Sequence, residues 1–250
     1  MAGRRGKRVL VVCSLVVCAA SAGWNAGPPG AVDGTRISGR IVFAEGQVRL
    51  AGEAPEGVPI DMSADPYCRD QHDEALLDRS VRVGPDRGVA GVLVQVLNAP
   101  AASVPSEAEV VLDQTGCIYT PGAVAVRVGQ PLVIRNSDAT LHNVRVAPAV
   151  NPGFNLGQPI RGIQSTRSFE TPEIGIQVRC DIHGWMTASI HVLGHDFFDI
   201  TGEDGSFTLP TLPPGDYEIE AWHPTLGTVA GHISVTADGA APLTLEFSSS

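Results

Sequence analysis

The sequence predicts an all-β protein, and two observations lead to this prediction. Branched apolar residues alternate with other residues in short runs, as at Val92, Val94 and Val96. Alternation with a period of two is typical of a β-strand with one buried face. Glycine and proline, at 28 and 19 of 250 residues, are frequent enough to end many short strands in turns. We expect antiparallel strands packed as a sandwich, with one helical piece near residues 65–77.

The composition excludes several classes of protein. Hydrophobic residues make up 43% of the chain and charged residues 18%, which excludes a disordered chain. The formal net charge of −10 argues against a nucleic-acid partner. The sequence has no nucleophile elbow, zinc-protease motif or phosphate loop, and we expect the protein not to be an enzyme.

Residues 1–22 have the pattern of a secretory signal peptide. Four basic residues, at positions 4, 5, 7 and 8, precede an apolar run over residues 9–20, and small residues follow. The run is too short to span a membrane, and the basic residues fit a buried N-terminal helix poorly. We expect export to the periplasm or a similar space, by a Sec-type rather than a twin-arginine signal. Losing those four basic residues would change the formal net charge from −10 to −14.

The chain divides into four predicted regions. The signal peptide at 1–22 is followed by a flexible lead-in at 23–35, a β domain at 36–194 and a smaller β unit at 195–250. Turn signals in the last region are Asp204-Gly205, read as a hairpin turn, and Pro213-Pro214-Gly215. Roughly four strands in about 55 residues are marginal for an independent core, so we expect this unit to pack against the first domain.

Two stretches of the first domain bring metal-ligating side chains together. Ile174, Ile176 and Val178 share their parity with Cys180, which points the thiol inward. The loop that follows carries His183 and Met186. His142 begins a second inward-facing run. A cysteine thiolate, two imidazoles and a weak axial thioether are the ligands of a blue-copper electron-transfer site. The spacing therefore predicts a copper site.

Other interpretations of these residues remain open. An inward histidine, a buried cysteine or a loop methionine is, taken alone, usually a packed core residue. Zinc is the main competing metal, although a methionine ligand would be unusual for it. His195 and His223 could meet in a second site, but nothing in the sequence fixes their geometry. One polar cluster consists of Asp70, His72, Asp73 and Glu74. A solvated helix face explains this cluster better than a metal site does.

Residues 120–194 resemble the cupredoxin family. Residues 136–146 resemble the segment that bears the first histidine, and residues 179–186 resemble the Cys-x2-His-x2-Met loop with amicyanin-like spacing. The resemblance implies a Greek-key sandwich with a single type 1 copper. The implied ligands are His142, Cys180, His183 and, in the axial position, Met186.

The same resemblance implies a function and a partner. Cupredoxins carry single electrons, and the second histidine is usually the partly exposed one through which electrons pass. We therefore expect the edge of His183 to be exposed beside Gly184 and Trp185 and to meet a redox partner such as a c-type cytochrome or a dehydrogenase. The alternatives are a structural or binding module for carbohydrate or protein with an incidental metal site, or a protein for copper delivery or storage.

The C-terminal unit resembles carboxypeptidase regulatory-like or transthyretin-like sandwich modules. The residues that carry this resemblance are 201–207, 212–217 and 221–223. The opening strands of such a module are not evident, so it is either truncated or completed by the first domain.

Three cysteines lie beyond the predicted signal peptide. With Cys180 assigned to copper, Cys68 and Cys117 remain. In an oxidising compartment such a pair is expected to form a disulfide.

Overall fold

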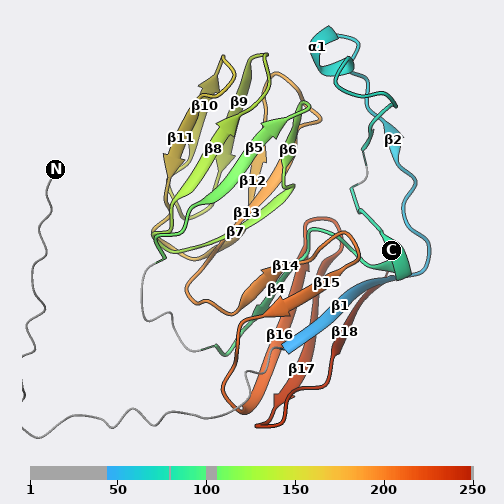
Figure 1. Ribbon diagram of the computed structural model, residues 1–250, viewed down its shortest axis with the longest axis vertical. Coiled ribbons are helices and arrows are strands. Elements are labelled where there is room, and N and C mark those ends of the chain that lie inside the picture. Colours follow the sequence, from blue (N-terminus) through green and yellow to red (C-terminus); the bar gives the residue numbers. More distant parts are fainter. Residues whose placement is uncertain (1–43, 79, 100–105, 249–250) are drawn as a thin grey trace, which may run out of the picture. The chain divides into compact units, whose positions relative to one another are not determined.

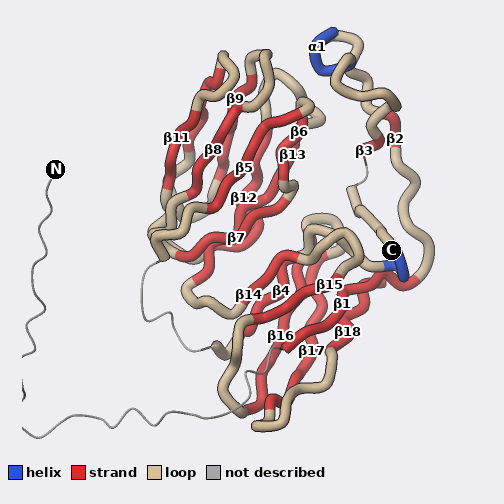
Figure 2. Tube along the Cα trace, in the orientation of Figure 1, coloured by secondary structure: helices blue, strands red, loops and turns tan. Residues whose placement is uncertain are grey.

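The structure is a computed structural model, and it describes residues 44–78, 80–99 and 106–248. Strands dominate these residues, and helical turns occupy only short segments (Figure 2). The predicted all-β fold is confirmed. The predicted signal peptide, the lead-in and residues 36–43 of the predicted first β domain lie outside the described residues.

One apolar core lies between a five-stranded and a four-stranded sheet (Figure 1). The strand order is β10-β9-β12-β13-β7 in the first sheet and β11-β8-β5-β6 in the second. The bounds are β5 Val110–Thr115, β6 Ile118–Thr120, β7 Ala123–Arg127, β8 Leu132–Asn136, β9 His142–Ala147, β10 Phe154–Gln158, β11 Gln164–Arg167, β12 Glu173–Arg179 and β13 Thr187–Leu193.

The alternation seen in the sequence corresponds to this core. Val144 and Val146 of β9 and Ile176 and Val178 of β12 are all buried. The strand directions differ from the prediction, because β13 pairs with β7 and β5 pairs with β8 in parallel. A period of two reports which face of a strand is buried and carries no information about the direction of its neighbour.

A second apolar core lies between the sheets β15-β1-β18 and β14-β4-β16-β17. Figure 1 shows β1 in blue beside β15 and β18 in orange and red, so strands from distant parts of the chain share one sheet. The bounds are β1 Ala44–Ala51, β4 Leu93–Val96, β14 Phe198–Ile200, β15 Ser206–Leu209, β16 Gly215–His223, β17 Gly227–Val235 and β18 Leu243–Ser248.

The C-terminal strands are thus completed by strands that precede the first sandwich. β1 pairs with β15 and β18, and β4 pairs with β14 and β16. The sequence had grouped β1 and β4 with residues 36–194, because nothing local shows which strand is the partner of which. These two strands are the ones that the C-terminal stretch lacks. The division into domains at residue 194 stays a prediction.

The Asp204-Gly205 turn joins strands that do not pair with each other. The Gly205 amide donates to the Gly202 carbonyl at 2.9 Å, which closes the turn. Gly205 has φ +75°, and a Cβ there would lie 2.3 Å from the Val48 carbonyl oxygen, so only glycine fits. Because β14 pairs with β4 while β15 pairs with β1, the turn moves the chain from one sheet to the other. The prediction of a hairpin turn here was wrong.

Between β1 and β4 the chain forms short elements only. These are β2 Val58–Pro59, α1 Pro66–Arg69, β3 Leu77–Asp78 and the 3-10 turn Pro85–Arg87. The helical piece expected near residues 65–77 is a single turn, because β3 pairs with β2 and draws the chain into an extended course. Within the described residues, no helix is long and apolar enough to cross a membrane.

Candidate metal centre

The four predicted ligands are held by two strands and one tight loop. His142 is the first residue of β9, Cys180 follows the last residue of β12, and β13 begins after Met186. The Cys180 amide donates to the Met186 carbonyl at 3.2 Å, and the Met186 amide donates to the His183 carbonyl at 2.9 Å. All four residues are buried. The loop is thereby fixed at both ends by the sheet.

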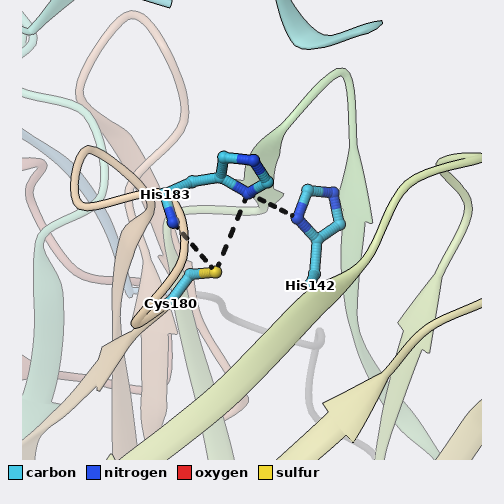
Figure 3. Close-up of side chains that lie close together, drawn as sticks. All are labelled: His142, Cys180 and His183. Atoms are coloured by element: carbon cyan, nitrogen blue, oxygen red, sulfur yellow. Dashed lines mark hydrogen bonds between the residues drawn. The ribbon is translucent and has the colours of Figure 1, made fainter. Parts of the chain in front are cut away.

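Three of these side chains converge (Figure 3). The Nδ1 atoms of His142 and His183 lie 2.9 Å apart, and the His183 Nδ1 atom lies 3.9 Å from Cys180 Sγ. The His183 amide also donates to Cys180 Sγ at 3.4 Å. One nitrogen of each imidazole and the sulfur lie within 4.8 Å of one another, as the ligands of a single ion must. Met186 is buried in the apolar core of the same sandwich.

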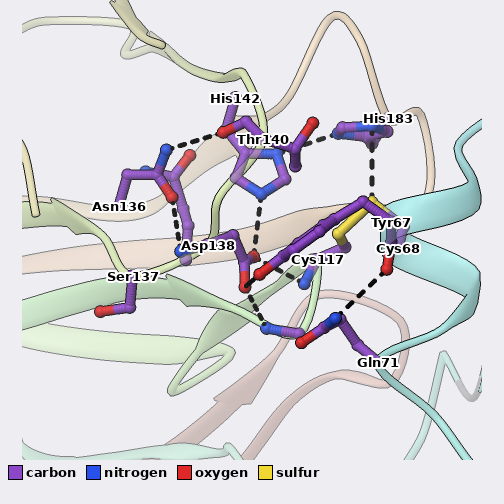
Figure 4. A network of polar contacts seen from close by, with 12 residues as sticks. Tyr67, Cys68, Gln71, Cys117, Asn136, Ser137, Asp138, Thr140, His142 and His183 are labelled. Atoms are coloured by element: carbon purple, nitrogen blue, oxygen red, sulfur yellow. Dashed lines mark hydrogen bonds and ion pairs between the residues drawn. A yellow bond between two sulfur atoms is a disulfide. The ribbon is translucent and has the colours of Figure 1, made fainter. Parts of the chain in front are cut away.

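An aspartate holds the outer nitrogen of each imidazole. Figure 4 shows the contact between Asp138 and His142. His142 Nε2 lies 2.9 Å from an Asp138 carboxylate oxygen, and His183 Nε2 lies 2.9 Å from an Asp65 carboxylate oxygen. The other oxygen of Asp138 accepts the Gly116 amide at 2.8 Å. A carboxylate that binds the far nitrogen of a histidine ligand fixes the orientation of the ring and strengthens it as a donor.

These contacts fit a cation between the two rings. Because an ionised carboxylate only accepts, the Nε2 atom of each ring carries the proton and donates it. The Nδ1 atom of each neutral ring then presents a lone pair, and two lone pairs 2.9 Å apart repel unless a positive charge lies between them. In metal-free protein, a proton shared between the two Nδ1 atoms would supply that charge. A soft metal ion is the natural replacement, since a thiol is the third group present.

The pKa values of these groups agree with such a pair. Burial lowers the pKa of His142, but Asp138 and Cys180 outweigh burial and raise it to about 9. Burial raises the pKa of the Cys180 thiol, but the His142 hydrogen bond and backbone amides outweigh it, so the pKa lies below its usual value. Each shift favours the charged form of its group, so the two groups stabilise each other's charge. Metal binding has to displace the imidazolium proton.

His183 is covered, and the expectation of an exposed edge was wrong. Its relative exposure is 2%, because residues 65–72, which we call the capping segment, lie against it. Cys68 Sγ lies 3.6 Å from His183 Nε2. On another side the Trp185 ring lies 5.0 Å from the His183 ring, and Trp185 Nε1 donates to the Cys117 carbonyl at 3.0 Å.

The predicted disulfide between Cys68 and Cys117 is present and ties the capping segment to the sandwich. His72 adds a second tie, donating from Nε2 to the Gly116 carbonyl at 2.7 Å. Tyr67 adds a third, with its hydroxyl 3.4 Å from an Asp138 carboxylate oxygen. The covering of His183 is thus built into the fold by ties from α1 itself and from His72, which follows it.

Asn143 locks β9 to the loop that bears Cys180. Its Oδ1 atom accepts the Asp181 amide at 2.6 Å, and its Nδ2 atom donates to Asn155 and Asp181. The Tyr119 hydroxyl donates to the Asn143 carbonyl at 2.8 Å. His142 precedes Asn143, and Cys180 precedes Asp181, so these contacts hold His142 and Cys180 at a fixed separation.

The remaining candidates do not form a metal site in the described part of the chain. Two other donor groups, one around Asp65 and one around Asp138, each include a cysteine whose sulfur is in the disulfide. Neither His195 nor His223 belongs to any donor group among residues 44–248 that the structure describes. In the polar cluster near residue 70, Asp70, Asp73 and Glu74 are exposed while His72 is used by the Gly116 carbonyl.

Sequence reasoning missed Asp65 and Asp138. Asp138 precedes His142 by four residues in a loop, where no period relates the two side chains. Asp65 is 118 residues from His183. The available signal was the predicted Cys68–Cys117 bond, which places the chain near Asp65 beside the sandwich without saying which side chain points inward.

Comparison with known proteins gives distant structural matches only. No family profile and no curated protein matches the chain. A copper(I) form of an amicyanin mutant matches at 19% identity and TM-score 0.31, over 40% of this chain and 98% of its own. A purple cupredoxin from Nitrosopumilus maritimus matches at 19% identity and TM-score 0.30, over 35% of this chain and 100% of its own.

A copper-containing nitrite reductase from Thermus scotoductus matches at 21% identity and TM-score 0.30. That match covers 38% of this chain, which spans only 24% of the reductase. Likeness at this level does not establish chemistry, which has to come from the side chains of the site.

Proposed function

We propose that the protein binds one copper ion through His142, Cys180 and His183, with Met186 as the weak axial ligand, and carries single electrons. The observation behind this proposal is the pair of Nδ1 atoms 2.9 Å apart beside the Cys180 sulfur, with each ring held from behind by a carboxylate. Two imidazoles and a thiolate are the strong ligands of a blue-copper centre.

The residues around the site suit electron transfer. When bound, copper would alternate between its two oxidation states. Asp65 and Asp138 keep the Nδ1 atoms directed inward, and Asn143 holds the two ligand-bearing strands together. Ligands that stay in place need little rearrangement when the charge of the metal changes. Burial of the three ligands excludes water from the position that a substrate would need, which favours electron carriage over catalysis.

The proposal for the partner is based on the net charge of the chain, and the proposal for the location is based on residues 1–22. We propose export by a Sec-type signal and an exchange partner with a basic docking face, such as a c-type cytochrome or a dehydrogenase. The formal net charge of −10 supports long-range attraction to such a partner. Because His183 is covered, the contact lies on the outer surface around the site rather than on the edge of that ring.

Copper delivery is the second candidate, and one observation favours it. The His142 proton has to leave when metal binds, so acid would favour metal release. A delivery protein would pass its copper to a metal-free acceptor, whereas an electron carrier would keep it through repeated oxidation and reduction. Repeated oxidation and reduction in the presence of a metal-free copper-binding protein distinguishes the two candidates. A delivery protein should lose its copper to that acceptor, and an electron carrier should keep it.

The test of the proposal is a copper titration followed by visible absorption. We expect an intense thiolate-to-copper band that saturates at one copper per chain. Cys180→Ser should lack the band while its circular dichroism stays that of a β protein. A wild-type protein that binds copper without this band contradicts the proposal.

A further inference from the structure

We propose that Asp65 of the capping segment is a positioning residue of the metal centre, holding His183 in the tautomer whose Nδ1 atom is free for the metal. The inference rests on the proposed function for the identity of the metal. The role of Asp65 in it rests on the geometry around that residue. Asp65 is not a ligand, since it reaches the outer nitrogen of the ring at 2.9 Å.

The two oxygens of Asp65 have separate tasks. One oxygen, Oδ1, caps α1 by accepting the amides of Tyr67 at 2.9 Å and Cys68 at 3.3 Å. The other, Oδ2, meets His183 Nε2 and also accepts the Thr140 hydroxyl at 3.3 Å. Because the helix amides hold Oδ1, the carboxylate cannot rotate without losing the cap. Its second oxygen is thereby directed at the imidazole.

Besides Asp65, two groups face the ring nitrogens of His183. Its Nδ1 atom lies 2.9 Å from His142 Nδ1, which donates or accepts according to the proton on its own ring. Its Nε2 atom also lies 3.6 Å from the Cys68 sulfur, but a disulfide sulfur is at most a weak acceptor. A neutral imidazole has one protonated nitrogen, and its partners decide which one. With Asp65 in place the proton is on Nε2. Without that acceptor, the proton is free to move to Nδ1, where it blocks the metal position.

The position of Asp65 depends on the disulfide-tied capping segment rather than on the sandwich. The Cys68–Cys117 bond, His72 and Tyr67 hold this segment against the core. Asp138 performs the matching task for His142 from within the sandwich, at the same 2.9 Å distance. The centre thus has one carboxylate fixed by the sandwich and one supplied by the segment that covers it.

Asp65→Asn is the decisive variant. Asparagine is as good a helix cap as aspartate, so its Oδ1 atom should keep the amides of Tyr67 and Cys68. Its Nδ2 group then faces His183 and can only donate, which forces the proton of the ring onto Nδ1. Asp70→Asn is the matched control, because Asp70 lies in the same segment, is exposed, and pairs only with Arg69. Both variants remove one negative charge.

Two readouts follow the variants. Nitrogen chemical shifts of His183 in metal-free, histidine-labelled protein report the tautomer directly. We expect Nε2–H in the wild type and in Asp70→Asn, and Nδ1–H in Asp65→Asn. Copper affinity should fall about 10- to 100-fold in Asp65→Asn alone, the usual cost of losing such a partner. The reduction potential should rise, because a less basic imidazole stabilises Cu(II) less.

The outcome that overturns the inference is an Asp65→Asn protein that matches Asp70→Asn in tautomer, affinity and potential. If Asp65→Asn does not fold, Asp65→Ser serves instead, since serine also caps a helix but has no group that reaches His183. Failure of the proposed function would be seen in a different measurement. The wild-type protein would then lack the thiolate-to-copper band, whereas the tautomer can be measured without copper.

Discussion

The pKa of a buried histidine is shifted in opposite directions in the two apolar cores. At the metal centre, His142 is buried beside the Asp138 carboxylate and the Cys180 thiol, and its pKa rises to about 9. In the second core, His223 is also buried, but its ring nitrogen only accepts the amides of Thr225 and Leu226. Burial, and to a smaller extent Arg82, lowers the pKa of His223 to about 4.

The difference shows what a histidine needs in order to be functional rather than structural. Burial alone removes the charge from the ring, as at His223. Carboxylate partners reverse that effect and also leave a nitrogen directed at its neighbours, as at His142. The sulfur and the second ring complete a candidate site that, among the residues the structure describes, belongs to the first core alone. Variants that remove one partner at a time measure how far this comparison holds.

The largest expected effect is that of Cys180→Ser. A serine hydroxyl is a poor ligand for copper, so the reversible redox wave should disappear. The β fold should persist, because the hydroxyl can still accept the His183 amide in place of the sulfur. Protein-film voltammetry and circular dichroism check the two halves of this prediction. A variant with an unchanged wave would place the redox centre elsewhere.

Removing the Cys68–Cys117 disulfide should have the next largest effect. The bond closes a separation of 49 residues, and the double substitution to serine should cost about 2–4 kcal/mol of unfolding free energy. Denaturant unfolding of metal-free protein measures this loss. The capping segment should also loosen, so the His183 ring should become accessible to a histidine-modifying reagent. Equal stability and equal reactivity would mean that the other ties hold the segment alone.

The sequence predicted the positions of the candidate ligands better than it predicted their surroundings. Strand parity was sufficient to direct His142 and Cys180 inward, because the alternation continues through both strands. The short Cys-x2-His-x2-Met spacing confined His183 and Met186 to the same loop. The count of cysteines was sufficient to pair Cys68 with Cys117, a pairing that the structure contains.

What the sequence did not predict depends on contacts between distant segments. The burial of His183 is due to residues 65–72, which no local pattern relates to the loop. The pairing of β1 and β4 with the C-terminal strands and the parallel pairs of the first sandwich are likewise decided by the whole fold. Strand alternation identifies a buried face, but the same face can pack against several partners.

The pH dependence of stability should reflect the neutral histidine of the second core. Native His223 stays neutral down to a pKa of about 4, whereas the unfolded chain takes up the proton below the ordinary histidine pKa of 6.5. The unfolded state therefore binds more protons between these values, and stability falls as pH drops from 6.5 toward 4. The slope for one histidine is at most about 1.4 kcal/mol per pH unit.

His223→Asn isolates this contribution. Asparagine can place its Oδ1 atom where the ring nitrogen accepts the Thr225 amide, yet it does not titrate. Denaturant midpoints between pH 4 and 7 should show a shallower slope for this variant than for the wild type. His191, whose pKa burial lowers to about 3, is unchanged in both proteins and adds the same slope to each. Identical slopes would show that His223 does not titrate as its burial implies.

The smallest expected effect at the metal centre is that of Met186→Leu. Leucine fills the buried volume of the methionine at little cost in stability, usually below about 1.5 kcal/mol. The axial thioether is a weak ligand that stabilises Cu(II) slightly, so copper should remain bound while the reduction potential rises. Voltammetry of the two proteins measures the shift. A lower potential in the variant would exclude Met186 as an axial ligand.

The most direct test of the metal centre is X-ray absorption at the copper edge on protein loaded with one equivalent. We predict a first coordination shell of one short copper–sulfur contact, from Cys180, and two nitrogens, from His142 and His183. The Cys180→Ser protein should lose the sulfur contact and keep the nitrogens. A wild-type shell of nitrogen and oxygen alone would contradict the proposed copper–thiolate centre.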